Sequence, residues 1–272
     1  MKEPERLSSE DREQERRTSL ASQEAPAVPA IEACALTKVF HDPRQGDVTA
    51  ASGIRFSCYP GEIFGLLGPN GAGKTTALRM LSTVLRPTSG TARIAGHDVL
   101  ENPLGVRKAI GYLSANTGLY PRLTARETLE YFGSLHGIRG SVLKDRVAHL
   151  VELFTMKDFC DVRCEKLSTG MKQKVSIART IVHDPPVLIL DEPTLGLDIL
   201  VASTMIRFVE ECRQRGKCIL FSTHIMSEVE KLCDRVAIIH RGTLRAVGSL
   251  PELRELTGRT YMDDIFMSLV EE

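Results

Sequence analysis

The sequence has no tryptophan, and aromatic residues make up only 5% of its 272 residues. Lysine and arginine together number 35, as do aspartate and glutamate, so the formal net charge is +0. Proteins that bind nucleic acid ordinarily carry a basic surface, and those that bind single strands add aromatic side chains on which bases stack. Since the sequence has neither feature, we expect no nucleic-acid partner.

Long apolar runs are missing as well. No run approaches the roughly 20 apolar residues of a membrane-spanning helix, and the charged N-terminus has no apolar core of a secretion signal. The seven cysteines are scattered, and only Cys160 and Cys164 lie close together, without a second pair to complete a zinc site. These absences predict free thiols in a reducing, cytoplasmic compartment.

The chain divides into three stretches. Residues 1–30 are charged and have almost no apolar periodicity, which predicts a disordered tail. From residue 31 to 248, short apolar strands alternate with helical patterns, an order typical of α/β proteins; residues 48–59 alternate loosely, as an antiparallel edge does, and about 115–165 reads as a helical insertion. Residues 249–272 are predicted to be a helical extension.

A phosphate loop is the strongest motif. Residues 68–76 match the pattern G-x-x-x-x-G-K-[ST], follow the apolar strand 63–67 and precede a helix, as the motif requires. Backbone N–H groups of such a loop surround a phosphate, Lys74 reaches the β- and γ-phosphates, and the Thr75 hydroxyl is a ligand for Mg²⁺. The alternative, a glycine-rich turn with a stray lysine, is disfavoured by the flanking elements. The residues of the loop are Gly68, Pro69, Asn70, Gly71, Ala72, Gly73, Lys74, Thr75 and Thr76.

Two acidic residues follow a second apolar strand. Residues 187–190 have no polar interruption, as in a strand buried on both faces of a parallel sheet, and Asp191 and Glu192 come directly after them. Ligands of open α/β sheets bind at this end of the strands. Asp191 is therefore a candidate for holding Mg²⁺, directly or through water, and Glu192 for activating a water molecule. The alternative is a solvated acidic turn.

Phe40 is a candidate for stacking on adenine, with an ordinary core phenylalanine as the equal alternative.

At this point the motifs resemble those of the ATP-binding subunits of ABC transporters. The phosphate loop, Leu-Ser-Thr-Gly-Met at 167–171, Leu-Asp-Glu-Pro-Thr at 190–194, Gly-Leu-Asp at 196–198 and Ser-Thr-His at 222–224 stand in that family's order. The resemblance implies a P-loop NTPase (RecA-like) core with an antiparallel β edge and an inserted helical subdomain, which binds ATP and Mg²⁺. Residues 118–127 and 167–198 look most like the sodium-extrusion-type ATPases, which serve two-component exporters.

The resemblance also implies roles for single residues. Ser168 and Gly170 open a helix that, in the family, binds the γ-phosphate held by another copy, so two nucleotide-binding subunits would pair head to tail, as a homodimer or with a paralogue. His224 would contact the γ-phosphate or the attacking water; its alternative is a capping or exposed histidine. Ala115 stands where the family has a glutamine, with Asn116 as a candidate substitute, and Thr169 and Met171 also depart from the family's pattern.

The expected function is an ATP-hydrolysing motor subunit on the inner face of a membrane, attached to a separate permease through the helical insertion and the loop 115–120. Two other functions stay open at this stage: a soluble member of the superfamily that acts on nucleic acid or ribosomes, and a non-catalytic regulatory subunit. The intact Lys74, Asp191, Glu192 and His224 argue against the second. Sodium as cargo is implied by the resemblance alone; drugs, lipids and peptides are equally open.

Overall fold

The computed structural model describes residues 28–43, 46–114, 118–196 and 199–271. Its centre is a six-stranded sheet in the order β10-β9-β3-β8-β7-β6, in which β9, β3, β8, β7 and β6 run parallel and β10 pairs antiparallel with β9. Every residue of β3, β7 and β8 is buried. The apolar runs thus predicted the central strands correctly. The strands are β3 (Ile63–Leu67), β6 (Ile110–Leu113), β7 (Val187–Asp191), β8 (Cys218–Thr223), β9 (Arg235–His240) and β10 (Thr243–Ser249).

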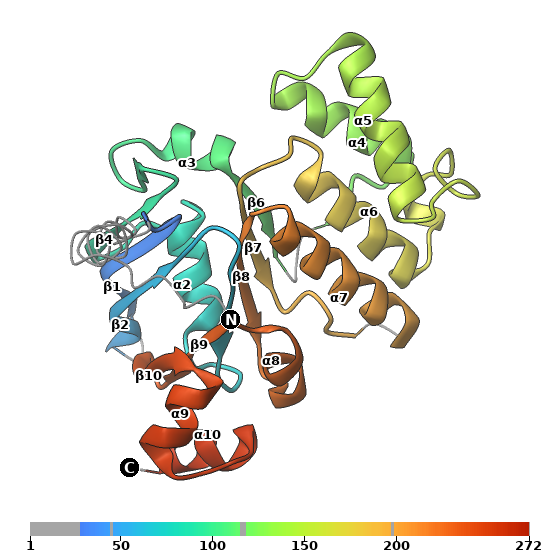
Figure 1. Ribbon diagram of the computed structural model, residues 1–272. Helices are drawn as coiled ribbons and strands as arrows, with labels where there is room; N and C mark the ends of the chain where they lie inside the picture. Colours follow the sequence, from blue (N-terminus) through green and yellow to red (C-terminus); the bar gives the residue numbers. More distant parts are fainter. Residues whose placement is uncertain (1–27, 44–45, 115–117, 197–198, 272) are drawn as a thin grey trace, which may run out of the picture.

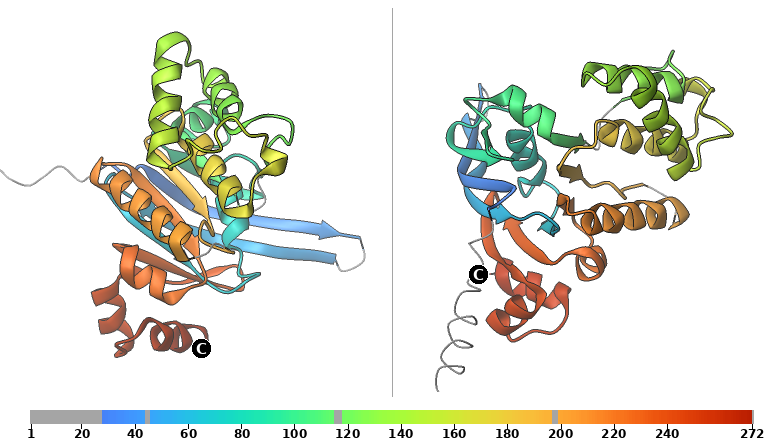
Figure 2. Two further views of the ribbon diagram at one scale, coloured as in Figure 1. Left: turned by 90° about the vertical axis from the view of Figure 1, so that its right-hand side faces the viewer. Right: turned by 45° about the horizontal axis from the view of Figure 1, so that its top comes forward.

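A second, antiparallel sheet has the order β2-β1-β4-β5, with β2 at its edge as the alternation of residues 48–59 predicted. Figure 2 shows the hairpin of β1 and β2 extending away from the body of the molecule. Helix α2 (Lys74–Leu81) lies between the two sheets, because Leu78 joins Ile31 of β1 and Phe64 of β3 in one core cluster. The strands are β1 (Ile31–Asp42), β2 (Gly46–Cys58), β4 (Ser89–Ile94) and β5 (His97–Asp98).

Four helices lie beyond the opposite face of the central sheet (Figure 1). Their apolar residues, such as Leu129, Leu150 and Phe208, share a core cluster with Leu188 of β7 and Phe221 of β8. The first of these helices begins at the predicted capping box: Thr124 Oγ1 accepts a hydrogen bond from the backbone of Glu127, whose carboxylate accepts one from the backbone of Thr124. The helices are α4 (Ala125–Leu135), α5 (Gly140–Leu153), α6 (Thr169–Ile181) and α7 (Ile199–Gln214), and a 3₁₀ turn spans Cys164–Lys166.

The C-terminal elements pack on β9. Apolar residues of α8 (Met226–Leu232), α9 (Leu250–Thr257) and α10 (Met262–Val270) form a third core cluster with Ile238. The sequence patterns left three elements unassigned, β5, β10 and α3 (Pro103–Ala109). In α3 only Val106 is buried, so this short helix has no apolar periodicity; it begins because the Asn102 side chain caps it and proline occupies its first position.

Several predictions lie outside the described residues: the charged tail up to residue 27, the loop positions Ala115 and Asn116, and Asp198 of the Gly-Leu-Asp motif. In the described ranges, no helix combines the length and apolar character that crossing a membrane requires.

The close approach of β4 to β1 generates a stability prediction. A Cβ atom on Gly90, whose φ is +76, would lie 2.1 Å from the carbonyl oxygen of Ala35, whereas Gly216, at φ +77, has no atom within 4 Å of the same position. Gly216→Ala should destabilise the protein by about 1 kcal/mol, the cost of the left-handed conformation alone. Gly90→Ala should cost about 3 kcal/mol or more because the backbone of β1 must also move. Urea unfolding of both variants tests this; equal losses would contradict it.

Candidate functional site

The phosphate loop connects β3 to α2 at the carboxyl end of the central sheet. Gly73, at φ 104, stands before the first turn of α2 and provides no side-chain cap, so the N–H groups of that turn stay available. A Cβ atom at Gly73 would lie 2.4 Å from the carbonyl oxygen of Ala50, which leaves room only for glycine. Above the loop lies a cavity of about 150 Å³. Its lining residues are Ala50, Pro69, Asn70, Gly71, Gly73, Lys74, Thr75, Thr76 and Glu192.

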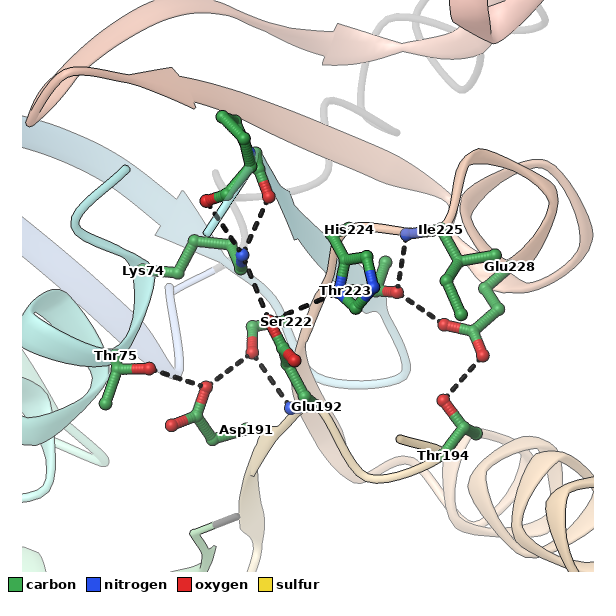
Figure 3. Close-up of polar contacts among 12 residues, drawn as sticks. Lys74, Thr75, Asp191, Glu192, Thr194, Ser222, Thr223, His224, Ile225 and Glu228 are labelled. Carbon is green, nitrogen blue, oxygen red and sulfur yellow. Dashed lines mark hydrogen bonds and ion pairs between the residues drawn. The ribbon is translucent and has the colours of Figure 1, made fainter. Parts of the chain in front are cut away.

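Lys74 is buried at the centre of this cavity, with only 4% of its side chain exposed. Its Nζ donates hydrogen bonds to the carbonyl oxygens of Gly68, at 2.7 Å, and Pro69, at 3.2 Å. The same nitrogen lies 3.1 Å from Glu192 Oε1 (Figure 3). Lys74 of the phosphate loop and Glu192 after β7 are therefore neighbours. Each is predicted as a nucleotide-site residue from a separate motif of the sequence.

Asp191 has one oxygen bonded and one without a partner. Thr75 Oγ1 and Ser222 Oγ both donate to Asp191 Oδ1, at 3.2 and 2.8 Å, while Oδ2 is buried with no hydrogen-bond partner among the described residues. Mg²⁺ prefers oxygen ligands and commonly uses one carboxylate and one hydroxyl together with substrate phosphates. The unpaired Oδ2 beside the Thr75 hydroxyl fits such an ion.

Glu192 stands at the turn after β7 in a left-handed conformation, with φ 47. Its backbone N–H is held by the side-chain and carbonyl oxygens of Ser222, at 3.0 and 3.2 Å. His224 Nδ1, from the end of β8, lies 3.4 Å from Glu192 Oε1. The structure thus brings Lys74, Glu192 and His224 around one point. Sequence reasoning missed the part played by Ser222, for which its place in the Ser-Thr-His motif was the only signal.

Three predicted site residues lie apart from this cluster. Ser168 is exposed at the start of α6, where its Oγ accepts a hydrogen bond from the backbone of Met171 at 3.3 Å, and Gly170 is in the first turn. Phe40 is 42% exposed on β1, with Lys38 Nζ 5.3 Å from its ring centroid. Neither Ser168, Gly170 nor Phe40 is among the described residues that line the phosphate-loop cavity.

A second, larger cavity of about 490 Å³ lies between β6 and the helices α4 and α6. Arg179 of α6 is buried there, 4.9 Å from the ring of Phe132, and donates to the carbonyl oxygen of Gly118. Burial lowers the pKa of Arg179. The rings of His136 and His183 stack at 3.6 Å, and burial together with His136 lowers the pKa of His183 to about 4, so this imidazole is neutral at pH 7.

The walls of this second cavity carry exposed apolar side chains. Val84 and Tyr120, which line it, are 64% and 52% exposed, and Leu135, next to the lining residue His136, is 63% exposed. The cavity is lined by Ser82, Val84, Arg107, Ile110, Tyr112, Gly118, Tyr120, Phe132, His136, Arg179, Thr180 and His183. We call it the interhelical groove below. Two arginines and no acidic residue are in this lining, so the groove is apolar with positive charge.

The sequence model of the family described as "ABC transporter" matches residues 51–195, more than half of the chain. The chain belongs to this family. The predicted resemblance is confirmed, and the chain is an ATPase, an ATP-binding subunit of the ABC transporter family.

Individual relatives agree. The ABC transporter ATP-binding protein NatA of Bacillus subtilis (strain 168) is 42% identical over 222 residues, which cover 81% of this chain and 90% of the relative. The Nod factor export ATP-binding protein I of Paraburkholderia xenovorans (strain LB400) is 40% identical over 204 residues, 75% of this chain and 67% of the relative.

Solved structures confirm the predicted fold class. A structure described as the ATP-binding subunit of an ABC transporter has a TM-score of 0.80 at 29% identity, and covers 88% of this chain and 99% of its own. The ATP-binding cassette MJ0796, solved as a dimer bound to ADP and Pi, has a TM-score of 0.74 at 22% identity, and covers 80% of this chain and 98% of its own. The second likeness supports the fold alone.

Ser222 hydrogen-bonds both the Asp191 side chain and the Glu192 backbone, so its removal should slow hydrolysis. Ser222→Ala removes a donor to Asp191 and an acceptor for the Glu192 backbone, so the rate of ATP hydrolysis at saturating Mg²⁺ and ATP should fall about 10- to 100-fold. Ser134→Ala, on the exposed surface of α4, serves as the control and should stay within about twofold. A wild-type rate in a folded Ser222→Ala variant would remove Ser222 from the site.

Proposed function

We propose that this ATPase is the motor subunit of an exporter, and that it binds and hydrolyses ATP at Lys74, Asp191, Glu192 and His224. The observation that carries the proposal is the convergence of Lys74 and His224 on the Glu192 carboxylate, at 3.1 and 3.4 Å. A lysine from a phosphate loop, an acid and a histidine around one point form the arrangement that phosphoryl transfer to water needs.

In this proposal the triphosphate lies along residues 68–76. The N–H groups of the loop and of the first turn of α2 hold its oxygens, and Lys74 exchanges its contact with Glu192 for a phosphate oxygen. Thr75 and the free oxygen of Asp191 hold Mg²⁺, which neutralises negative charge on the phosphates. Phe40 stacks on the adenine ring, at the exposed hairpin where the side chain is accessible.

Glu192 then has the role of general base. Its carboxylate accepts a proton from the water that attacks the γ-phosphate, and His224 contacts the γ-phosphate or holds that water in place. Glu192 suits this role because its side chain is only 13% exposed and its backbone is tied to β8 by Ser222.

The site is completed by a second nucleotide-binding subunit, which in the simplest case is another copy of this chain. Ser168 and Gly170 of one copy bind the γ-phosphate held by the other, in a head-to-tail pair. Support comes from the exposure of Ser168 at the start of α6, where its oxygen caps the N–H of Met171 and its hydroxyl hydrogen is left to donate.

The partner in the membrane is a separate permease, and we propose that a segment of it docks in the interhelical groove at the inner, cytoplasmic face. The groove's volume of about 490 Å³, its aromatic lining and the exposed Val84 and Leu135 support this. The ATP-binding domain would span 31–248, with the helical subdomain at about 115–165 and an extension at 249–272. Sodium as the cargo rests only on the resemblance of residues 118–127 and 167–198.

The proposed base is tested by Glu192→Gln. Without a carboxylate to accept the proton, hydrolysis should fall at least about 100-fold while ATP binding persists, so a dimer should accumulate with ATP and Mg²⁺. Phosphate release and size-exclusion chromatography measure the two effects. Glu210→Gln, exposed on α7, is the control. Hydrolysis at the wild-type rate would refute the role of Glu192, and a wild-type chain that binds but never hydrolyses ATP would favour the regulatory alternative.

The proposed docking groove is tested by a matched pair of substitutions. Leu135 at the groove and Leu256 on α9 are 63% and 65% exposed, so exchange of either for glutamate costs little folding energy. In the native host, Leu135→Glu should lower the membrane-bound fraction of the protein several-fold, and Leu256→Glu should not. The ATPase rates of both purified variants should match the wild type. Equal membrane binding of the two variants would rule out the groove.

A further inference from the structure

Glu228 is a buried acidic residue that none of the predicted motifs contains. It lies in the first turn of α8, is 9% exposed and has no ion-pair partner in the described part of the chain. Figure 3 shows its side chain reaching toward Thr194 and Thr223. A buried carboxylate is costly unless its oxygens are hydrogen-bonded, so the identity of its partners indicates what it does.

Both oxygens of Glu228 accept hydrogen bonds from threonine hydroxyls. Oε1 accepts from Thr194, in the turn after β7, and Oε2 accepts from Thr223, at the end of β8, each at 2.5 Å. An ionised carboxylate offers acceptors only, and each of the two hydroxyls supplies one donor. Because these bonds are charge-assisted, they are stronger than bonds between neutral groups.

The two threonines lie beyond the last residue pair that joins β7 to β8. That pair is Asp191 with Ser222; Thr194 follows in the turn after β7, and Thr223 is the last residue of β8, where it pairs with Leu67 of β3. Thr194 stands two positions after Glu192, and Thr223 directly before His224. The Glu228 carboxylate therefore joins the two segments that carry the proposed base and the proposed histidine, at a level where β7 and β8 no longer pair with each other.

The loop after His224 is held at the same point. Thr223 Oγ1 accepts a hydrogen bond from the backbone N–H of Ile225 at 3.0 Å while it donates to Glu228. The Thr223 hydroxyl thus fixes the residue before His224 and, through the N–H of Ile225, the residue after it. On the other side, the left-handed conformation of Glu192 is one that a non-glycine residue keeps only where its surroundings hold it.

We propose that Glu228 is a positioning residue for hydrolysis, which sets the approach of His224 to Glu192 by bridging Thr194 and Thr223. It acts through those residues, since Glu228 is not among the described residues that line the phosphate-loop cavity. The inference rests on the roles proposed above for Glu192 and His224. A residue that serves only stability would instead affect unfolding without a specific effect on turnover.

The first experiment compares Glu228→Ala with Glu228→Gln in the full chain, with thermal unfolding recorded for each. Glu228→Ala should lower kcat about tenfold or more, with KM for ATP within about twofold of wild type, because the loss concerns the approach of two groups and not nucleotide binding. Glu228→Gln retains a planar group that can bond both hydroxyls, and should recover most of kcat. Lys231→Ala, exposed on the same helix, is the control.

The second experiment asks whether Glu228 acts through His224. In a His224→Ala background, the further loss of kcat caused by Glu228→Ala should fall below about twofold, because the group being positioned is gone. An undiminished further loss would overturn the proposal, and so would a wild-type kcat in the folded Glu228→Ala variant.

Should Glu228→Ala fail to fold, Thr194→Val and Thr223→Val test the same bridge with nearly the same side-chain shape. Each should lower kcat at an unchanged KM; wild-type kcat in both would overturn the proposal. Failure of this inference stays distinguishable from failure of the proposed function. Hydrolysis at the wild-type rate by Glu192→Gln would refute the function, whereas wild-type kcat in the Glu228 and threonine variants, with Glu192→Gln inactive, would refute only the bridge.

Discussion

The structure depends on the parallel pairing of three buried strands. β3, β8 and β7 lie side by side and point the same way, so the loops after them start from one edge of the sheet. Lys74 follows the first of these strands and His224 the second, while Asp191 ends the third and Glu192 follows it. Because parallel neighbours are joined by long crossovers, residues far apart in sequence meet there, and apolar burial on both faces holds the meeting point in place.

Charge balance within this edge constrains the chemistry. Lys74 and Glu192 are a close pair with little exposure, and removing one partner of such a pair leaves a buried charge at a cost of about 3 to 5 kcal/mol. A phosphate that approaches Lys74 competes with Glu192 for the same ammonium group. Nucleotide binding would therefore free the Glu192 carboxylate from Lys74. Both events depend on the same ammonium group in the phosphate-loop cavity.

The helices on the other side of the sheet connect this site to the two proposed partner surfaces. Gln173 of α6 donates to the carbonyl oxygen of Pro193, next to Glu192, and the same helix carries Ser168 at its start and Arg179 near its end. One rigid helix thus spans the phosphate-loop side, the proposed contact with a second copy and the interhelical groove. If α6 moves as a rigid body, a shift at one of these places is carried to the others.

The sequence by itself determined the features that depend on residues close together in the chain. These are the phosphate loop, the uninterrupted apolar strands and the capping box at Thr124. Only the tertiary structure decided that Ser222 hydrogen-bonds both Asp191 and Glu192, and that Glu228 bridges Thr194 and Thr223. Thr194 and Glu228, for example, are 34 positions apart in the chain. Likewise α3, with one buried residue, left no periodic pattern to detect. Local motifs depend on backbone spacing, whereas a hydrogen bond between distant side chains depends on how the sheet assembles.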